Sequence, residues 1–124
     1  MDILKQIEYW KRGSIDDRGV ARLLIDGGKT LQGLFFVHLS LEKALKACVC
    51  SATGELAPKS HDLPRLAELA RLVLVRDQAD FLARMNLYSL EGRYPTQFPV
   101  HPNPQTVEQY YKQFTEVQEW LLEK

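Results

Sequence analysis

The sequence has no excess charge of either sign, few cysteines and no long apolar run. Sixteen Lys and Arg residues balance sixteen Asp and Glu residues, so the formal net charge of the 124-residue chain is +0. It lacks the global positive field that drives sequence-independent binding to nucleic acid, and any contact with RNA must be local. No apolar stretch approaches the roughly 18 residues that cross a bilayer, and no secretory signal is visible. We therefore expect a cytosolic protein without a membrane association.

Cysteine and histidine are too few and too scattered for a metal centre. Cys48 and Cys50 are the two cysteines, and on a helix this spacing turns their side chains about 200° apart. Neither a disulfide nor a shared metal site follows, so we expect two reduced packing residues. The three histidines add no zinc-ligand spacing. The sequence predicts no metal and no cofactor.

Helical periodicity covers most of the chain. Apolar residues recur at spacings of three and four over residues 3–26, 30–51, 77–91 and 106–121, as amphipathic helices require. A shorter helix, capped by Ser60 or Asp62, should end between residues 72 and 75, and the prolines of residues 92–104 indicate a loop. We predict one all-α domain over residues 1–124, an up-and-down antiparallel bundle of four long helices plus a short one.

Some helix boundaries stay open or rest on single residues. The first helix is either continuous or divided at Gly13-Ser14, and Gly27-Gly28 ends it in both cases. Thr30 and Thr106 are the expected N-caps of the second and last helices. Where each helix begins and ends determines the direction in which its polar side chains point.

The second helix is apolar around most of its circumference, which is typical of the central helix of a bundle. Its polar residues His38, Glu42 and Lys46 are four apart and lie along one side. This strip is either a binding surface or a solvated edge with an i,i+4 ion pair. His38 also lies in the apolar seam, where it is either a hydrogen-bonded core group or a catalyst.

Asp17 falls on the apolar line of the first helix. In a continuous helix its carboxylate turns inward and needs a basic partner, for which Arg93, Lys43 and Lys46 are the candidates. In a divided helix it is an exposed carboxylate. The alternatives predict different environments for one side chain.

Arg93 lies in an Arg-Tyr-Pro sequence where a helix stops and the proline-rich loop begins. A guanidinium there can bind a phosphate or carboxylate bidentately, and His101 follows in the same loop. Together they could hold a phosphate and transfer a proton during RNA cleavage. The alternative is that Arg93 ties the loop to Asp17 or Glu42.

Three sequence blocks resemble the HEPN (higher eukaryotes and prokaryotes nucleotide-binding) domain family. They are LEKALK at residues 41–46, KSHDL at residues 59–63 and YSLEGRYP at residues 88–95. Their order and spacing match, and the resemblance covers residues 5 to 122. It implies a four-helix up-and-down bundle, usually a homodimer, from a prokaryotic cytoplasm.

The resemblance also implies a function. Many members work beside a small nucleotidyltransferase-fold protein, so we expect a nucleotide- or nucleic-acid-associated homodimer that partners such a protein, in a toxin–antitoxin pair. Phosphate would bind in a groove, and a structural polar cluster would support it. The expected groove residues are His38, Glu42, Lys46 and Arg93, and those of the cluster are Asp17, Lys43, His61 and Asp62.

Two alternatives remain, and whether the chain is an enzyme stays open. Other HEPN members resemble ribonuclease toxins in which an Arg is followed after four to six residues by a His, paired across the dimer. Here seven residues separate Arg93 from His101. The first alternative is a metal-independent endoribonuclease with Arg93 and His101 as catalytic residues, and the second is a non-catalytic dimerisation module.

Overall fold

The computed structural model describes residues 2–89 and 101–124, and within them every regular element is helical. The predicted all-α bundle is confirmed. The α-helices are α1 (Ile3–Asp26), α2 (Thr30–Thr53), α3 (Leu63–Leu69), α4 (Arg76–Met85) and α5 (Pro104–Leu122), and a 3-10 turn, η1 (Asn86–Tyr88), follows α4.

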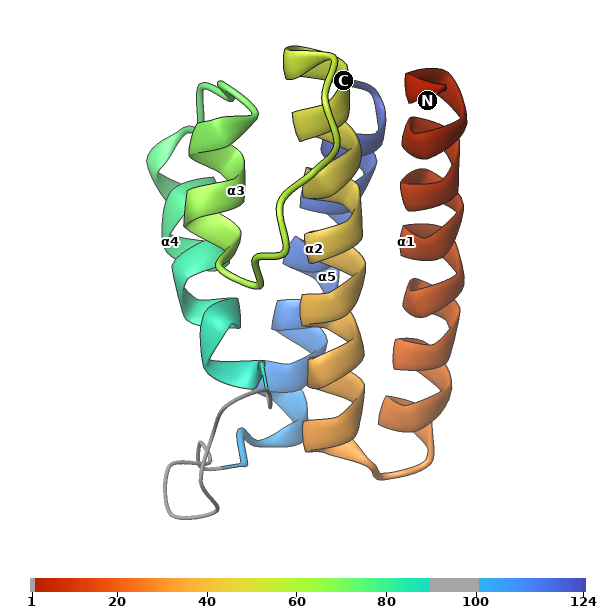
Figure 1. The fold of residues 1–124 in the computed structure, drawn as a ribbon. Coiled ribbons are helices and arrows are strands. Elements are labelled where there is room, and N and C mark those ends of the chain that lie inside the picture. The colour runs from red at the N-terminus through yellow and green to blue at the C-terminus, as the bar shows by residue number, and fades with distance from the viewer. Residues whose placement is uncertain (1, 90–100) are drawn as a thin grey trace.

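Helix α2 occupies the middle of the bundle and contacts α1, α3, α4 and α5. Helices α1, α2, α4 and α5 alternate in direction, while the short α3 runs beside α2 in the same sense (Figure 1). Residues 54–62 form no helix and run back along α2 before α3 begins (Figure 1). This return brings His61 and Asp62 beside the middle of the central helix.

Helix α1 is continuous, which settles the question left open at Gly13-Ser14. Asp2 caps it by accepting a hydrogen bond from the Lys5 backbone N–H at 3.3 Å. The tight hairpin from α1 to α2 depends on Gly33, because a Cβ there would lie 2.6 Å from Ile25 Cγ1. With α1 unbroken, Asp17 is fixed on the side that faces α2.

Two N-cap predictions were wrong. Lys29, not Thr30, is the N-cap position of α2, and it makes no side-chain cap hydrogen bond. Its backbone carbonyl already accepts the bond from the Gly33 N–H at 2.8 Å, so the helix starts one residue early. Helix α5 is capped by Asn103 rather than Thr106, with an Asn103 Oδ1 to Thr106 N distance of 2.8 Å. Pro104 fits the first turn, where its missing N–H costs nothing.

The stretch expected to close the third helix was also predicted wrongly. Helix α3 ends at Leu69, and residues 72–75 form an extended connection to α4. Arg71 has φ of 59°, and the Leu72 N–H donates to the Ala67 carbonyl at 3.1 Å. This left-handed residue with a six-to-one hydrogen bond terminates the helix. Of the fourth predicted helix, α4 and η1 reach residue 88, and residues 90 and 91 lie outside the described part.

The core lies around α2 and includes side chains from every helix. Its largest members are Phe81, Phe114, Leu34, Leu41, Leu45, Leu63, Leu66, Leu82, Met85 and Leu121. A buried polar group joins α1, α2 and α5 within this core. Ser14 Oγ and Ser40 Oγ each donate to the other serine's backbone carbonyl, at 2.8 and 2.7 Å. Gln118 Nε2 donates to Ser14 O and to both hydroxyls at 3.1 Å. These bonds fix the axial positions of three helices relative to one another.

Candidate functional site

His38 lies at the centre of a buried polar cluster on α2. Its side chain is 1% exposed, and its Nε2 is 2.9 Å from the backbone carbonyl oxygen of His61. A carbonyl only accepts, so Nε2 carries the proton and donates. Nδ1 faces Glu42 Oε1 at 4.0 Å. Burial lowers the pKa of His38, opposed by the nearby Glu42 charge. His38 is therefore a neutral imidazole that anchors the turn before α3.

Glu42 connects Lys46 and His61 within this cluster. Its Oε1 accepts from His61 Nδ1 at 2.8 Å, and its Oε2 accepts from Lys46 Nζ at 3.1 Å. Glu42 and Lys46 are only 4% and 6% exposed. The Lys46 ammonium also lies 5.2 Å from the centre of the Trp10 ring of α1. The solvated-edge interpretation of the strip is therefore wrong, because the pair is enclosed.

His61 is exposed to solvent, with 43% of its side chain accessible, whereas His38, Glu42 and Lys46 are buried. Since a carboxylate only accepts, the bond to Glu42 places the proton of neutral His61 on Nδ1. A histidine oriented by a carboxylate behind it can take up a proton at its other ring nitrogen, and the cation so formed can donate a hydrogen bond to a phosphate. The chemistry available at this cluster thus lies at His61, and the buried residues hold that ring in place.

Asp62 and Asn86 join the α3 start to the turn after α4. Asp62 Oδ1 accepts from the Arg65 backbone N–H at 3.4 Å and from Asn86 Nδ2 at 3.0 Å. Asn86 Oδ1 in turn accepts from the Leu63 N–H at 3.0 Å. Through these bonds, Asp62 caps α3 and fixes η1 beside His61. We name His38, Glu42, Lys46, His61 and Asp62 the His61 cluster.

Asp17 belongs to a separate pair. Its buried carboxylate lies 2.8 Å from Lys43 Nζ, between α1 and α2. Of the two candidate cations in the described part of the chain, Lys43 is the partner, and Lys46 is engaged by Glu42 instead; Arg93, the third candidate, lies outside that part. The four residues that we expected to form one structural cluster therefore divide into two groups. Asp17 and Lys43 form one, and His61 and Asp62 belong to the other.

Of the proposed catalytic pair, Arg93 and His101, the structure describes only His101. His101 is an exposed residue three positions before α5. Arg93 lies outside the described residues, and with it the geometry of the Arg-Tyr-Pro block and its place in the predicted phosphate groove. The structure therefore brings together His38, Glu42, Lys46, His61 and Asp62, without describing how Arg93 meets them.

Sequence reasoning missed Trp10 and Asn86. In the sequence Trp10 is one of the apolar residues at helical spacing in residues 3–26, and its role as the aromatic neighbour of Lys46 depends on how α1 docks on α2. Asn86 gives only a weak signal in the sequence, because the residues that it bonds to are 23 and 24 positions away. A polar residue inside the run that buries Phe81, Leu82 and Met85 was the available hint.

The described residues contain no group of three or more His, Cys, Asp or Glu side chains placed to hold a metal. Cys48 and Cys50 are free and buried, and burial raises the pKa of Cys48 to about 11. None of the helices in the described ranges is both long and apolar enough to cross a membrane.

Comparison with known proteins identifies the family. Residues 7–124 match the HEPN domain, which is nearly the whole chain. No curated protein and no solved structure matched. The matched range includes every residue of the His61 cluster, the three sequence blocks and all of α2 and α5. The chain therefore belongs to the HEPN domain family.

Proposed function

We propose that this protein is the homodimeric partner of a small nucleotidyltransferase-fold protein, in a toxin–antitoxin pair, and that it binds a nucleotide or RNA phosphate at the exposed edge of the His61 cluster. Membership of the HEPN family supports a nucleotide- or RNA-associated function. The observation that carries the proposal is the His61 ring, held by the buried carboxylate of Glu42 at 2.8 Å.

In this proposal the buried residues of the cluster do not contact the phosphate themselves. A phosphate that reached Lys46 would have to break the 3.1 Å pair with Glu42 and enter a site that is almost closed to solvent. The full cost of leaving Glu42 buried without its cation is several kcal/mol, about 3–5 for a buried pair. His38, Glu42 and Lys46 therefore orient His61, and His61 and Arg93 are the residues we expect to contact phosphate.

The test is to induce the chain alone in bacteria, as wild type, Arg93→Ala and His101→Ala, and to follow growth and total RNA integrity. We expect all three to be harmless. Co-expression with a nucleotidyltransferase-fold protein encoded in the same genome should then give a stable complex whose mass, by light scattering, contains two copies of this chain.

Two results contradict the proposal in different ways. Growth arrest with fragmented RNA, lost in both variants, would establish the metal-independent ribonuclease that uses Arg93 and His101. A dimer that binds neither phosphate nor a nucleotidyltransferase, and in which Arg93→Ala changes only thermal stability, would establish a non-catalytic dimerisation module.

A further inference from the structure

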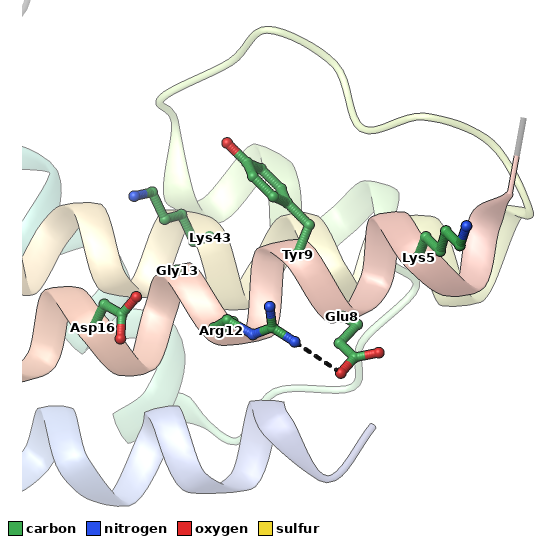
Figure 2. A pocket seen from close by; sticks show the side chains of 7 residues that line it. All are labelled: Lys5, Glu8, Tyr9, Arg12, Gly13, Asp16 and Lys43. Atoms are coloured by element: carbon green, nitrogen blue, oxygen red, sulfur yellow. Dashed lines mark hydrogen bonds and ion pairs between the residues drawn. The ribbon is translucent and has the colours of Figure 1, made fainter.

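A polar pocket lies on α1, and none of the His61 cluster residues lines it. It has a volume of about 580 Å³ and is lined by residues of α1 together with Lys43 of α2. In Figure 2 the Tyr9 ring and the Lys43 side chain stand on one side of Gly13, and Arg12 and Asp16 lie on the other. The volume lies within the roughly 300–1,000 Å³ typical of small-molecule sites. We name it the α1 pocket.

Gly13 forms the floor of the α1 pocket. A Cβ at this position would lie 3.0 Å from Lys43 Cδ, so a larger side chain would crowd the lysine. With glycine there, the Lys43 stem lies against α1 and its ammonium reaches Asp17 at 2.8 Å. That ion pair holds Lys43 in position, which reduces the entropy lost when an anion binds.

Tyr9 supplies an exposed aromatic surface to the pocket. The residue is 65% exposed, although its ring is large and apolar. Its ring meets the Trp10 ring edge to face, with centroids 5.1 Å apart and planes at 72°. Trp10 is itself partly buried against Lys46, so this contact restricts the orientation of Tyr9 while one ring face stays available. An oriented, exposed tyrosine can stack on a nucleic-acid base.

The charged residues around Tyr9 suit the phosphate and the ribose of a ribonucleotide. Lys5, Arg12 and Lys43 are cations that can bind phosphate. Among the described residues Arg12 is engaged by Glu8 alone, at 3.1 Å, in a pair whose side chains are each 71% exposed. Such an exposed pair is weak and can open for a ligand. Asp16 is a carboxylate of the kind that accepts hydrogen bonds from ribose hydroxyls. A site of phosphate-binding cations alone would not need it.

We propose that the α1 pocket binds a ribonucleotide, with its base on Tyr9, its phosphate at Lys43 and Arg12, and its ribose hydroxyls at Asp16. Tyr9 and Asp16 are seven residues apart on one helix, a rise of about 10 Å. The inference goes beyond the proposed function, because it adds a second site, separate from the phosphate that we expect at the His61 cluster.

The experiment measures binding of a labelled six-nucleotide polyadenylate RNA by fluorescence anisotropy, beside the DNA of the same sequence and free AMP by calorimetry. It uses the full chain as wild type, Tyr9→Ala, Tyr9→Phe and Arg12→Gln. Both positions are exposed, so these variants should fold, and thermal melts check this. Leu23→Ala on α1 and Lys112→Gln on α5 are matched exposed controls.

We expect Tyr9→Ala and Arg12→Gln each to weaken RNA binding about tenfold or more, and Tyr9→Phe and both controls to leave it within about threefold of wild type. DNA should bind more weakly than RNA, because it lacks the 2′-hydroxyl. AMP that binds with the same dependence on Tyr9 identifies a free nucleotide as the ligand, and binding of the oligomer alone identifies an RNA strand.

Three results would overturn the inference. The first is wild-type protein that binds neither RNA nor AMP, which would also remove nucleotide binding from the proposed function and leave the nucleotidyltransferase complex to its separate measurement. The second is binding that survives Tyr9→Ala and Arg12→Gln but is lost in His61→Ala, which assigns the nucleotide to the His61 cluster. The third is equal affinity for RNA and DNA, which refutes the role of Asp16.

Discussion

Replacing Lys46 by methionine tests how the buried charges of the His61 cluster contribute to stability. Methionine keeps the length of the lysine stem and removes the ammonium, so packing changes little. Glu42, which is 4% exposed, then loses its partner at 3.1 Å and keeps only the hydrogen bond from His61. Breaking a buried pair in this way costs about 3–5 kcal/mol. Because His61 still donates to Glu42, we expect the lower end of that range, about 3 kcal/mol.

The matched control is the double variant Lys46→Met/Glu42→Gln. With the carboxylate neutralised, no uncompensated charge remains, and a glutamine oxygen can still accept from His61 Nδ1. We expect the double variant to recover most of the lost stability, which gives a coupling free energy of about 2 kcal/mol or more between the two positions. Replacing a buried ion pair by neutral groups of similar volume is often close to neutral.

The assay is urea denaturation followed by circular dichroism at one fixed protein concentration, because a dimer's stability depends on concentration. A loss of about 3 kcal/mol should lower Tm by roughly 10 °C for a chain of this size. The reasoning fails if Lys46→Met costs less than about 1 kcal/mol, the range of an exposed pair. It also fails if the single effects simply add in the double variant.

Three further predictions concern other parts of the fold. Burial lowers the pKa of His38, so unfolding at acidic pH takes up a proton and the stability of the fold should fall as pH drops below about 6.5. The difference between the urea midpoints at pH 5.5 and 7.5 should be smaller in His38→Gln than in wild type. Gly33→Ala should lower the free energy of unfolding by about 1–3 kcal/mol, because the new methyl group meets Ile25. Gly19→Ala should raise it by about 0.5–1 kcal/mol, because a Cβ there meets nothing within 4 Å. Thermal melts of the two variants compare these effects. Gln118→Leu removes the contacts of the Gln118 amide with Ser14 and Ser40 and the bond that its oxygen accepts from Arg18. We expect a cost of about 1–3 kcal/mol in the free energy of unfolding, measured by denaturant titration.

Each of these predictions has an outcome that contradicts its basis. Equal pH dependence in His38→Gln would mean that another group titrates in this range. Equal melting temperatures for the two alanine variants would mean that the α1–α2 hairpin relaxes around a methyl group. An unchanged midpoint for Gln118→Leu would mean that the two serines satisfy each other without the amide.

The helices and their order follow from the sequence because they depend on local patterns. Apolar spacing placed α1, α2 and α5 to within a few residues, and the surplus of apolar positions on residues 30–51 identified the central helix. The inward side of α1 was also readable, and with it the need of Asp17 for a cation. The errors at Thr30, Thr106 and residues 72–75 concern helix boundaries. At each of them a single hydrogen bond, from a backbone N–H to a backbone carbonyl or to the Asn103 side chain, decides where the helix begins or ends.

What the sequence by itself determined is therefore the helical bundle, its central helix and the residue types available to a site. Only the tertiary structure decided that Asp17 pairs with Lys43, that Glu42 holds His61 from 19 positions away, and that Gln118 bonds to Ser14 across 104 positions. Local periodicity fixes the face on which a side chain lies, but not which residue of another helix it meets. That choice follows from the docking of α1 and of the 54–62 return on α2, which is set by packing of the whole core.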